Sequence, residues 1–176
     1  IIELAIGKGF DQNEITFRAV DFKPDFLPML EYDAEVLDKL CKRWDKVKSD
    51  PKLDLFVSML EDELFDKSKN LEGKLVVFSE SVDTVNYLEK ELKERLHRRD
   101  ILAVCAKNRN RLRETIQANF DAKYKKEWRN DYNIIITSDV LAEGVNLHRA
   151  NVIVNYDSPW NATRLMQRIG RVNRIG

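Results

Sequence analysis

Four short apolar runs, each ending in polar residues, constrain the fold of this chain most strongly. They lie at residues 74–79, 101–105, 133–137 and 151–156. Such runs, rich in β-branched residues, are typical of parallel strands that are buried on both faces. Segments with helical spacing of apolar residues follow the first, second and fourth runs. This alternation predicts an α/β fold, a parallel sheet with right-handed crossovers and helices on both of its faces.

Residues 1–50 predict a partly helical lead-in ahead of a domain that spans residues 51–176. The lead-in begins abruptly, as though cut from a longer chain, and Pro24 and Pro28 are expected to interrupt any long helix. Apolar residues recur with helical spacing from residue 33 to residue 48, at Val36, Leu37, Leu40, Trp44 and Val47.

Cap residues predict where the helices of the domain begin. Asp50 and Pro51 have the residue types preferred at the N-cap and at the first helical position. Ser81 or Asp83 can begin the helix after the first strand, and another helix is expected from about Arg109. Asn161 is a plausible N-cap for the last helix. Residues 121–132 are charged and are expected to form an exposed insertion.

The composition excludes several classes of protein. No run of apolar residues is long enough to span a membrane. The two cysteines lie far apart and no Cys/His cluster has metal-ligand spacing, so we expect a reduced, cytoplasmic protein without a metal site. His97 and His148 are expected to be surface residues without a catalytic role.

The net charge is zero, but the charge is unevenly distributed. Residues 93–129 hold 12 Lys and Arg against 5 Asp and Glu, whereas residues 1–92 hold 13 against 21. The uneven distribution of charge along the chain is informative even though the net charge is zero. The basic segment could be a solvated helix face or a surface that binds phosphates.

Polar and charged residues follow the third predicted strand and recur on the helix after the fourth. Asp139 and the sequence Glu-Gly-Val-Asn, residues 143–146, follow the third strand. On the last helix, Leu165, Ile169 and Val172 share one face, and Gln167, Arg171 and Arg174 form a row on a neighbouring face. Arginines in such a row are often only a solvated face. The combination with the strand-end loop favours a functional row beside the strand ends.

This combination resembles motifs V and VI of superfamily 2 helicases and translocases, which lie in the C-terminal, second RecA-like domain of the motor. Residues 155–161 and 174–176 resemble the Swi/Snf-type branch most. The resemblance implies a RecA-like fold and an ATP-dependent helicase or translocase as the full-length protein. It implies an ATP site shared with an N-terminal RecA-like domain, with Mg²⁺ held by that other half.

The resemblance also implies roles for eight residues. Arg171 and Arg174 would act on the transferred phosphoryl group, with Arg174 the preferred arginine finger. The ATP-binding residues would be Gly144, Asn146 and Gln167. The nucleic-acid-binding residues would be Ser79, Ser138 and Arg113. For the two serines, simple capping is an open alternative, and for Asp139 we favour a hydrogen bond that fixes the loop.

Some features depart from the family pattern. Ser138 stands where threonine is usual, and Asn146 replaces the aspartate of DEAD-box relatives. The chain stops at Gly176, inside a motif that normally continues. No phosphate-binding loop of the Walker A type and no Asp-Glu magnesium motif is found in the sequence.

These features lead to the expectation that the chain alone is inactive and has no cofactor of its own. Its partners would be nucleic acid, with duplex DNA favoured over RNA, and the N-terminal motor domain. The alternatives are half of an RNA helicase or a non-catalytic module that binds nucleic acid.

Overall fold

The computed structural model describes residues 22–138, 141 and 145–172. The chain divides into two compact units, and the first ends at Ser49. In the part of the chain that the structure describes, no helix is long and apolar enough to cross a membrane.

The first unit contains the helix α2 (Phe26–Trp44), none of whose described residues is buried. Its polar face carries ion pairs between residues four apart, Glu35 with Lys39 and Asp38 with Lys42. The helix begins earlier than the prolines suggested. Pro28 lies in the first turn, where the missing backbone N–H would have no partner within the helix in any case.

The second unit opens with α3 (Pro51–Asp62), which begins as predicted. The Asp50 side chain accepts a hydrogen bond from the Leu53 backbone N–H at 3.0 Å, and Pro51 occupies the first helical position. Apolar residues at helical spacing bury one face of α3, namely Leu53, Phe56 and Leu60.

The sheet has four parallel strands, β1 (Leu75–Phe78), β2 (Ile101–Val104), β3 (Ile134–Thr137) and β4 (Val152–Asn155). Their order is β2-β3-β1-β4, so β1 pairs with both β3 and β4. The carboxyl ends of all four strands therefore meet at one edge. The predicted parallel α/β sheet is confirmed.

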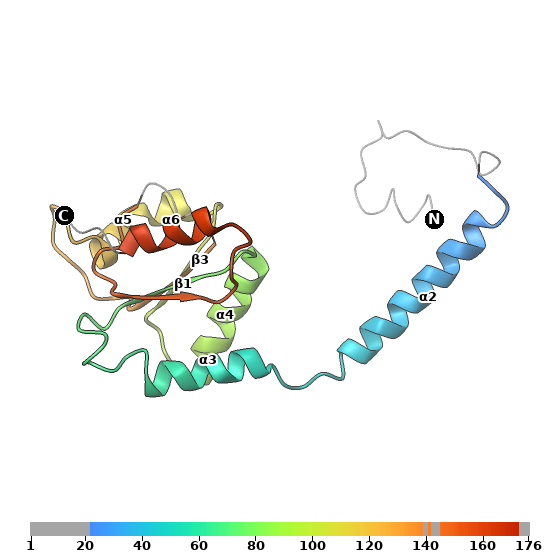
Figure 1. Ribbon diagram of the computed structural model, residues 1–176, viewed down its shortest axis with the longest axis horizontal. Helices are drawn as coiled ribbons and strands as arrows, with labels where there is room; N and C mark the ends of the chain where they lie inside the picture. Colours follow the sequence, from blue (N-terminus) through green and yellow to red (C-terminus); the bar gives the residue numbers. More distant parts are fainter. Residues whose placement is uncertain (1–21, 139–140, 142–144, 173–176) are drawn as a thin grey trace. The chain divides into compact units, whose positions relative to one another are not determined.

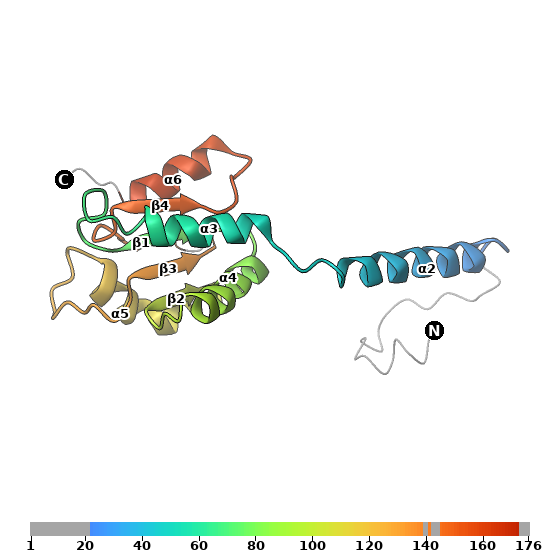
Figure 2. The same cartoon turned by 90° about the horizontal axis from the view of Figure 1, so that it is seen from below.

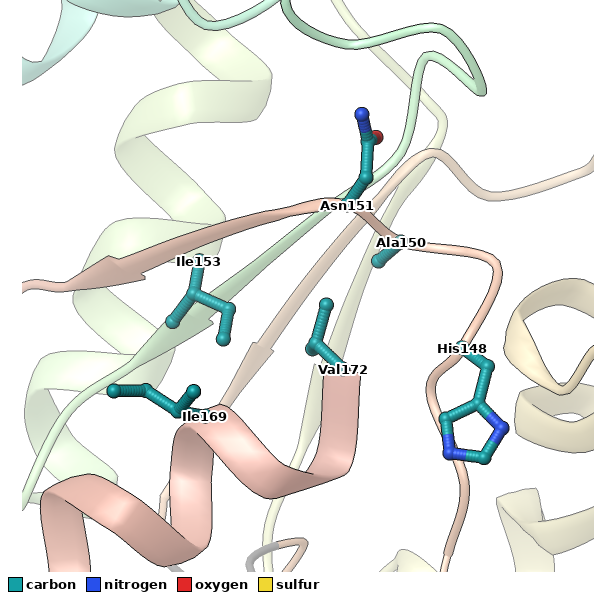
Figure 3. Close-up of a pocket in the computed structure, with 6 residues that line it drawn as sticks. All are labelled: His148, Ala150, Asn151, Ile153, Ile169 and Val172. Atoms are coloured by element: carbon teal, nitrogen blue, oxygen red, sulfur yellow. The ribbon is translucent and has the colours of Figure 1, made fainter. Parts of the chain in front are cut away.

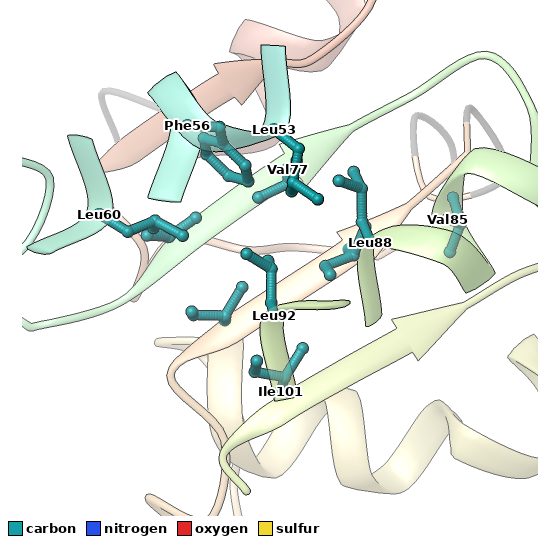
Figure 4. Packing of buried hydrophobic residues seen from close by; sticks show 11 residues of the cluster. Leu53, Phe56, Leu60, Val77, Val85, Leu88, Leu92 and Ile101 are labelled. Carbon is teal, nitrogen blue, oxygen red and sulfur yellow. The ribbon is translucent and has the colours of Figure 1, made fainter. Parts of the chain in front are cut away.

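Alternate residues of the strands point to two separate cores. Leu75 and Val77 lie on the face that packs against α3 and α4 (Val82–Arg95). Figure 4 shows Val77 beside the side chains of these two helices. Val76 and Phe78 lie on the other face, which α5 (Arg109–Phe120) and α6 (Ala162–Val172) cover (Figures 1 and 2). Helices on both faces explain why the strands are apolar throughout.

The helices begin where their cap residues indicate. The Ser81 hydroxyl accepts a hydrogen bond from the Asp83 N–H, and the Asn161 side chain accepts one from the Thr163 N–H at 2.8 Å. The segment 121–132 is largely exposed, as expected, but several hydrogen bonds hold it to the domain, including those from Tyr124 and Lys126 to Glu114. Arg149 donates to the carbonyls of Ala118 and Arg129 and lies 4.7 Å from the Trp128 ring centroid.

Candidate functional site

Five side chains at the carboxyl ends of β1 and β4 meet in what we call the strand-end cluster: Lys52, Ser79, Asn155, Asp157 and Arg168. The Asp157 carboxylate accepts a hydrogen bond from the Ser79 hydroxyl. The same carboxylate accepts a second hydrogen bond from the Lys52 ammonium at 2.8 Å. Residues from α3, β1 and the segment after β4 are thereby joined at one carboxylate.

Arg168 joins α6 to this cluster and is fully buried. Its Nη1 donates to the Asn155 side-chain oxygen at 3.0 Å and to the Asp157 backbone carbonyl at 3.1 Å. The guanidinium lies 5.3 Å from the centroid of the Phe78 ring, a distance suited to a cation–π contact. Arg168 thus fixes α6 against the ends of β1 and β4.

Sequence reasoning missed Arg168 because it assigned the functional arginines to a different row of the helix. One signal was available. Arg168 lies three residues after Leu165 and four before Val172, so it shares the apolar face of α6. A charged residue on a buried face needs partners, and the polar ends of β1 and β4 provide them.

The surroundings of Asp157 favour its ionised form. Partial burial would raise the pKa of its carboxyl group, but the hydrogen bonds from Lys52 and Ser79 and the charge of Lys52 lower it below its ordinary value. The Lys52 ammonium also lies 4.0 Å from the centroid of the Tyr156 ring. Burial raises the pKa of the Tyr156 hydroxyl to about 12, so this ring stays neutral.

The predicted ATP-facing residues are partly brought together. Gln167 is exposed on α6 and Arg171 is half-buried one turn later. The Leu147 backbone N–H donates to the Arg171 carbonyl at 3.0 Å, so the half-buried Asn146 lies on a segment attached to α6. Gly144, Arg174 and Asp139 lie outside the described residues.

The row of Gln167, Arg171 and Arg174 stays a prediction, because Arg174 lies outside the described residues. On α6, Arg168 contacts the ends of β1 and β4, and the Arg171 carbonyl accepts a hydrogen bond from the segment ahead of β4. The helix turns back after β4 and lies along the face of the sheet (Figure 1).

The residues predicted to bind nucleic acid differ in accessibility. Ser79 is fully buried and its hydroxyl is bonded to Asp157, so in this structure it does not face solvent. Ser138, directly after β3, is half-buried, and Arg113 on α5 is exposed. Asn108 precedes α5 and accepts a hydrogen bond from the Cys105 N–H, which places the start of this helix at the carboxyl end of β2.

A pocket of about 490 Å³ lies between β4, α6 and the turn before β4 (Figure 3). Its apolar side is formed by Ile153, Ile169 and Val172. His148 also lines it and is half-buried, whereas His97 is exposed. Among the described residues, no group of three His, Cys, Asp or Glu could hold a metal ion.

Comparison with known families now identifies this arrangement. The family model of the helicase conserved C-terminal domain matches residues 52–176. The chain belongs to this family. The match covers the whole sheet, the strand-end cluster and α6, and it begins at Lys52.

Several helicases are similar to this helicase C-terminal domain in sequence. The uncharacterized ATP-dependent helicase YqhH of Bacillus subtilis is 29% identical over 119 residues, which cover 65% of this chain and 19% of that protein. The probable ATP-dependent RNA helicase ddx51 of Dictyostelium discoideum is 26% identical over 124 residues, 69% of this chain and 22% of that protein. The chain thus spans about a fifth of the length of these relatives.

Solved structures show the same fold. The C-terminal part of the Fun30 ATPase domain has a TM-score of 0.53 and 23% identity, over 80% of this chain and 45% of that chain. S. cerevisiae Dbp5 bound to RNA and ADP BeF3 has a TM-score of 0.51 and 26% identity, over 71% of this chain and 29% of that chain. The predicted RecA-like fold and the membership among helicase C-terminal domains are confirmed.

Proposed function

We propose that this chain is the second motor domain of an ATP-dependent nucleic-acid helicase or translocase. The observation that carries the proposal is the family match across residues 52–176, with Arg171 held beside the segment of Asn146. In this proposal ATP binds between the chain and an N-terminal RecA-like domain of the same protein. Closure of that site would drive movement along nucleic acid.

ATP hydrolysis requires positive charge near the transferred phosphoryl group more than it requires covalent catalysis by the protein. Transfer of a phosphoryl group to water develops negative charge on the phosphate oxygens, and a positioned arginine stabilises that charge. Arg171 and Arg174 are the proposed arginines, with Arg174 the preferred finger. Asn146 would lie near the ribose, Gly144 would allow close approach of the backbone, and Gln167 would orient water or phosphate.

Cofactor binding is divided between the two halves in this proposal. The residues of this chain would complete the ATP site, while Mg²⁺ and the phosphate-binding loop would belong to the N-terminal half. When bound, Mg²⁺ would neutralise charge on the phosphates. Arg171 of α6 and Arg174 would add to that neutralisation from the opposite side of the cleft.

The nucleic-acid surface is proposed at the carboxyl edge of the sheet and the start of α5. Ser138 and the exposed Arg113 remain suitable for contacts with phosphates. Ser79 would have to release Asp157 before its hydroxyl could bind a phosphate. In this proposal Ser79 therefore contacts nucleic acid only after its hydrogen bond to Asp157 is broken.

Duplex DNA is the nucleic acid along which we propose that the protein moves, because residues 155–161 resemble the Swi/Snf-type branch. RNA is the second candidate, since ddx51 is named as an RNA helicase and the matching Dbp5 structure contains RNA. Movement along either DNA or RNA requires contacts that do not depend on the base sequence. A non-catalytic binding module is the alternative from another class.

ATP turnover by the full-length protein, measured with duplex DNA, single-stranded DNA or RNA, tests the proposal. We expect strong stimulation by duplex DNA. Stimulation by RNA alone would support the second candidate. A full-length protein that binds nucleic acid but never hydrolyses ATP would contradict the motor function and favour the binding module.

The isolated 176-residue chain should not hydrolyse ATP and should bind it weakly at best. The sequence contains no phosphate-binding loop, so its residues can only complete a site. Phosphate release by the purified chain is the measurement. Steady turnover that Arg174→Ala abolishes would overturn the proposed division of the site.

A further inference from the structure

The segment 121–132, between the end of α5 and the start of β3, carries a tryptophan that is both exposed and fixed in position. Trp128 is 50% exposed. Its indole Nε1–H donates to the Tyr124 carbonyl at 3.3 Å, and the Arg149 guanidinium lies 4.7 Å from its ring centroid. The ring is therefore held in one place while half of the residue faces water.

The backbone beside Trp128 is fixed as well. Arg149 donates to the Arg129 carbonyl at 2.9 Å and to the Asn130 side-chain oxygen at 2.6 Å. The Arg129 backbone N–H donates to the Ala118 carbonyl at 2.8 Å, which ties the segment to the end of α5. The orientation of the ring is thus set before any ligand arrives, and such preorganisation lowers the entropic cost of binding.

Cations lie close to Trp128 in the sequence. Three exposed cations of the segment have no salt bridge in the part of the chain that the structure describes: Lys123, Lys125 and Arg129. Glu127 and Asp131 are exposed too, so the surface is only mildly basic. Charge of this size gives weak phosphate binding by itself. A ligand that also stacks on the indole would use both features of the surface.

This surface lies away from the nucleic-acid contacts proposed above. The segment 121–132 leads into β3 and so lies at the amino edge of the sheet. Ser138 follows the other end of β3, and α5, which carries Arg113, begins at the carboxyl end of β2. A ligand on Trp128 would therefore occupy a second site.

We propose that Trp128, with Lys123, Lys125 and Arg129, forms a second site that binds single-stranded nucleic acid, with one base stacked on the indole. Every base has a π-face, so the site accepts any sequence. Unpaired strand is the ligand because the base faces of a duplex are already covered by their stacked neighbours. The inference goes beyond the proposed motor function, since binding at this site needs no ATP.

The test is the affinity of the full-length protein, without ATP, for a fluorescently labelled oligothymidylate, measured by anisotropy. We expect Trp128→Leu to lower this affinity by about ten-fold, within the range for loss of one base–aromatic contact. Trp128→Phe should retain most of it, because the ring is replaced by another ring. A strand of the same length with abasic sites should bind equally to the wild type and to Trp128→Leu, since it has no base to stack.

Trp44→Leu, in α2, is the matched control. Trp44 is 76% exposed, and in the described residues its side chain has no hydrogen bond or ring contact. Its replacement should leave the affinity for both strands unchanged. Replacing Lys123 and Lys125 together by alanine should weaken both strands by a similar factor, because phosphates are present in both. Melting temperatures of all variants verify that they are folded.

The outcomes decide between stacking and a structural role. Unchanged affinity of Trp128→Leu for oligothymidylate would contradict the site. Equal weakening of the thymidine and abasic strands by Trp128→Leu would show that the ring only supports the surface, and the stacking site would again be wrong. A full-length protein that never hydrolyses ATP would contradict the motor function alone, because this binding is measured without ATP.

Discussion

The two ends of the sheet are both fixed by polar clusters, but the clusters differ in what they connect. At the carboxyl end, the strand-end cluster joins α3, β1, β4 and α6 through Asp157 and Arg168. At the amino end, a second chain of hydrogen bonds joins the residues just before the strands. We call it the strand-start cluster, and its members are Asn70, Lys74, Arg98, Asp100 and Asn133.

The strand-start cluster is built around a buried lysine. Lys74 is 1% exposed, and its Nζ donates to the Tyr132 carbonyl at 2.7 Å and lies 3.4 Å from the Asn133 side-chain oxygen. Asn133 in turn donates to the Asp100 carboxylate at 2.9 Å. Burial lowers the pKa of Lys74 to about 8, and the charge of Arg149 acts in the same direction.

The difference shows that a buried charge alone does not indicate a functional residue. Both clusters bury a cation next to an aromatic ring, Arg168 over Phe78 and Lys74 over Phe120. The strand-start cluster joins strand starts, the loops before them and, through the Phe120 ring, the end of α5. The strand-end cluster holds the helix of the proposed finger, so changes near it should affect catalysis and changes at the other end should affect stability.

The largest expected effect is the loss of ATP turnover when Arg171 or Arg174 is replaced. In the full-length protein, Arg171→Ala and Arg174→Ala should each lower kcat by about 10³–10⁵, the range for arginine fingers. ATP affinity should change little, because the charge they stabilise develops in the transition state. The measurement is kcat and KM for ATP. Arg98→Ala, in the strand-start cluster, is the control and should keep kcat. A normal kcat in both Arg171→Ala and Arg174→Ala would indicate that these arginines only belong to a solvated face.

The next effect is on stability at the strand starts. Asn133→Ala removes the bridge between Lys74 and Asp100 and should lower the free energy of unfolding by about 1–3 kcal/mol, the usual range for unpaired buried polar groups. Urea denaturation of this chain measures it. Asn151→Ala, which removes an exposed hydrogen bond to the Lys69 carbonyl, should have a smaller effect. If the full-length Asn133→Ala variant is folded but has a lower kcat, the strand-start cluster also affects catalysis, and the proposed difference between the two ends of the sheet is wrong.

A smaller effect is expected in the pH dependence of stability. The pKa of Lys74 is about 8 in the folded chain against an ordinary 10.5, so between these values the unfolded state binds more protons. Stability should therefore rise with pH in this window, by about 2 kcal/mol from pH 8 to pH 10. The raised pKa of Tyr156 acts oppositely only above about pH 10. Lys74→Met should flatten the rise, and an unchanged slope would contradict the burial of a charged Lys74.

The smallest effect concerns the salt dependence of nucleic-acid binding. If about three phosphates are neutralised, log K should fall with log salt at a slope of about −2 to −3. Replacing Arg109, Arg111 and Arg113 together by alanine should flatten the slope by about one and leave the fold intact. Lys39→Ala with Lys42→Ala, in α2, serves as the control. Salt-independent binding, or a large preference for one base sequence, would favour a dedicated recognition module.

The fold could be predicted from the sequence because its signals are local. Four apolar runs and the caps at Asp50, Ser81 and Asn161 each depend on residues within a few positions of one another. Pro28 misled the prediction of α2, since a proline in the first turn does not end a helix.

The strand-end cluster could be predicted only in part. Its contacts join residues far apart in the sequence, such as Ser79 with Asp157 and Phe78 with Arg168. The sequence around Ser79 does not distinguish a hydroxyl that binds a phosphate from one that binds a carboxylate. Arg168 stands one position from Gln167 in the motif. Its spacing from Leu165 and Val172 indicates that it is the buried one of the two, but the sequence does not show which groups it contacts.

The affinity of the full-length protein for ADP with fluoroaluminate, a mimic of the transferred phosphoryl group, tests the central claim most directly. If α6 supplies charge to the transition state, Arg171→Ala should weaken this complex by about 10²-fold or more while leaving ADP affinity nearly unchanged. Arg98→Ala should bind both as the wild type does. Equal affinity of the Arg171→Ala variant and the wild type for the mimic would contradict the account.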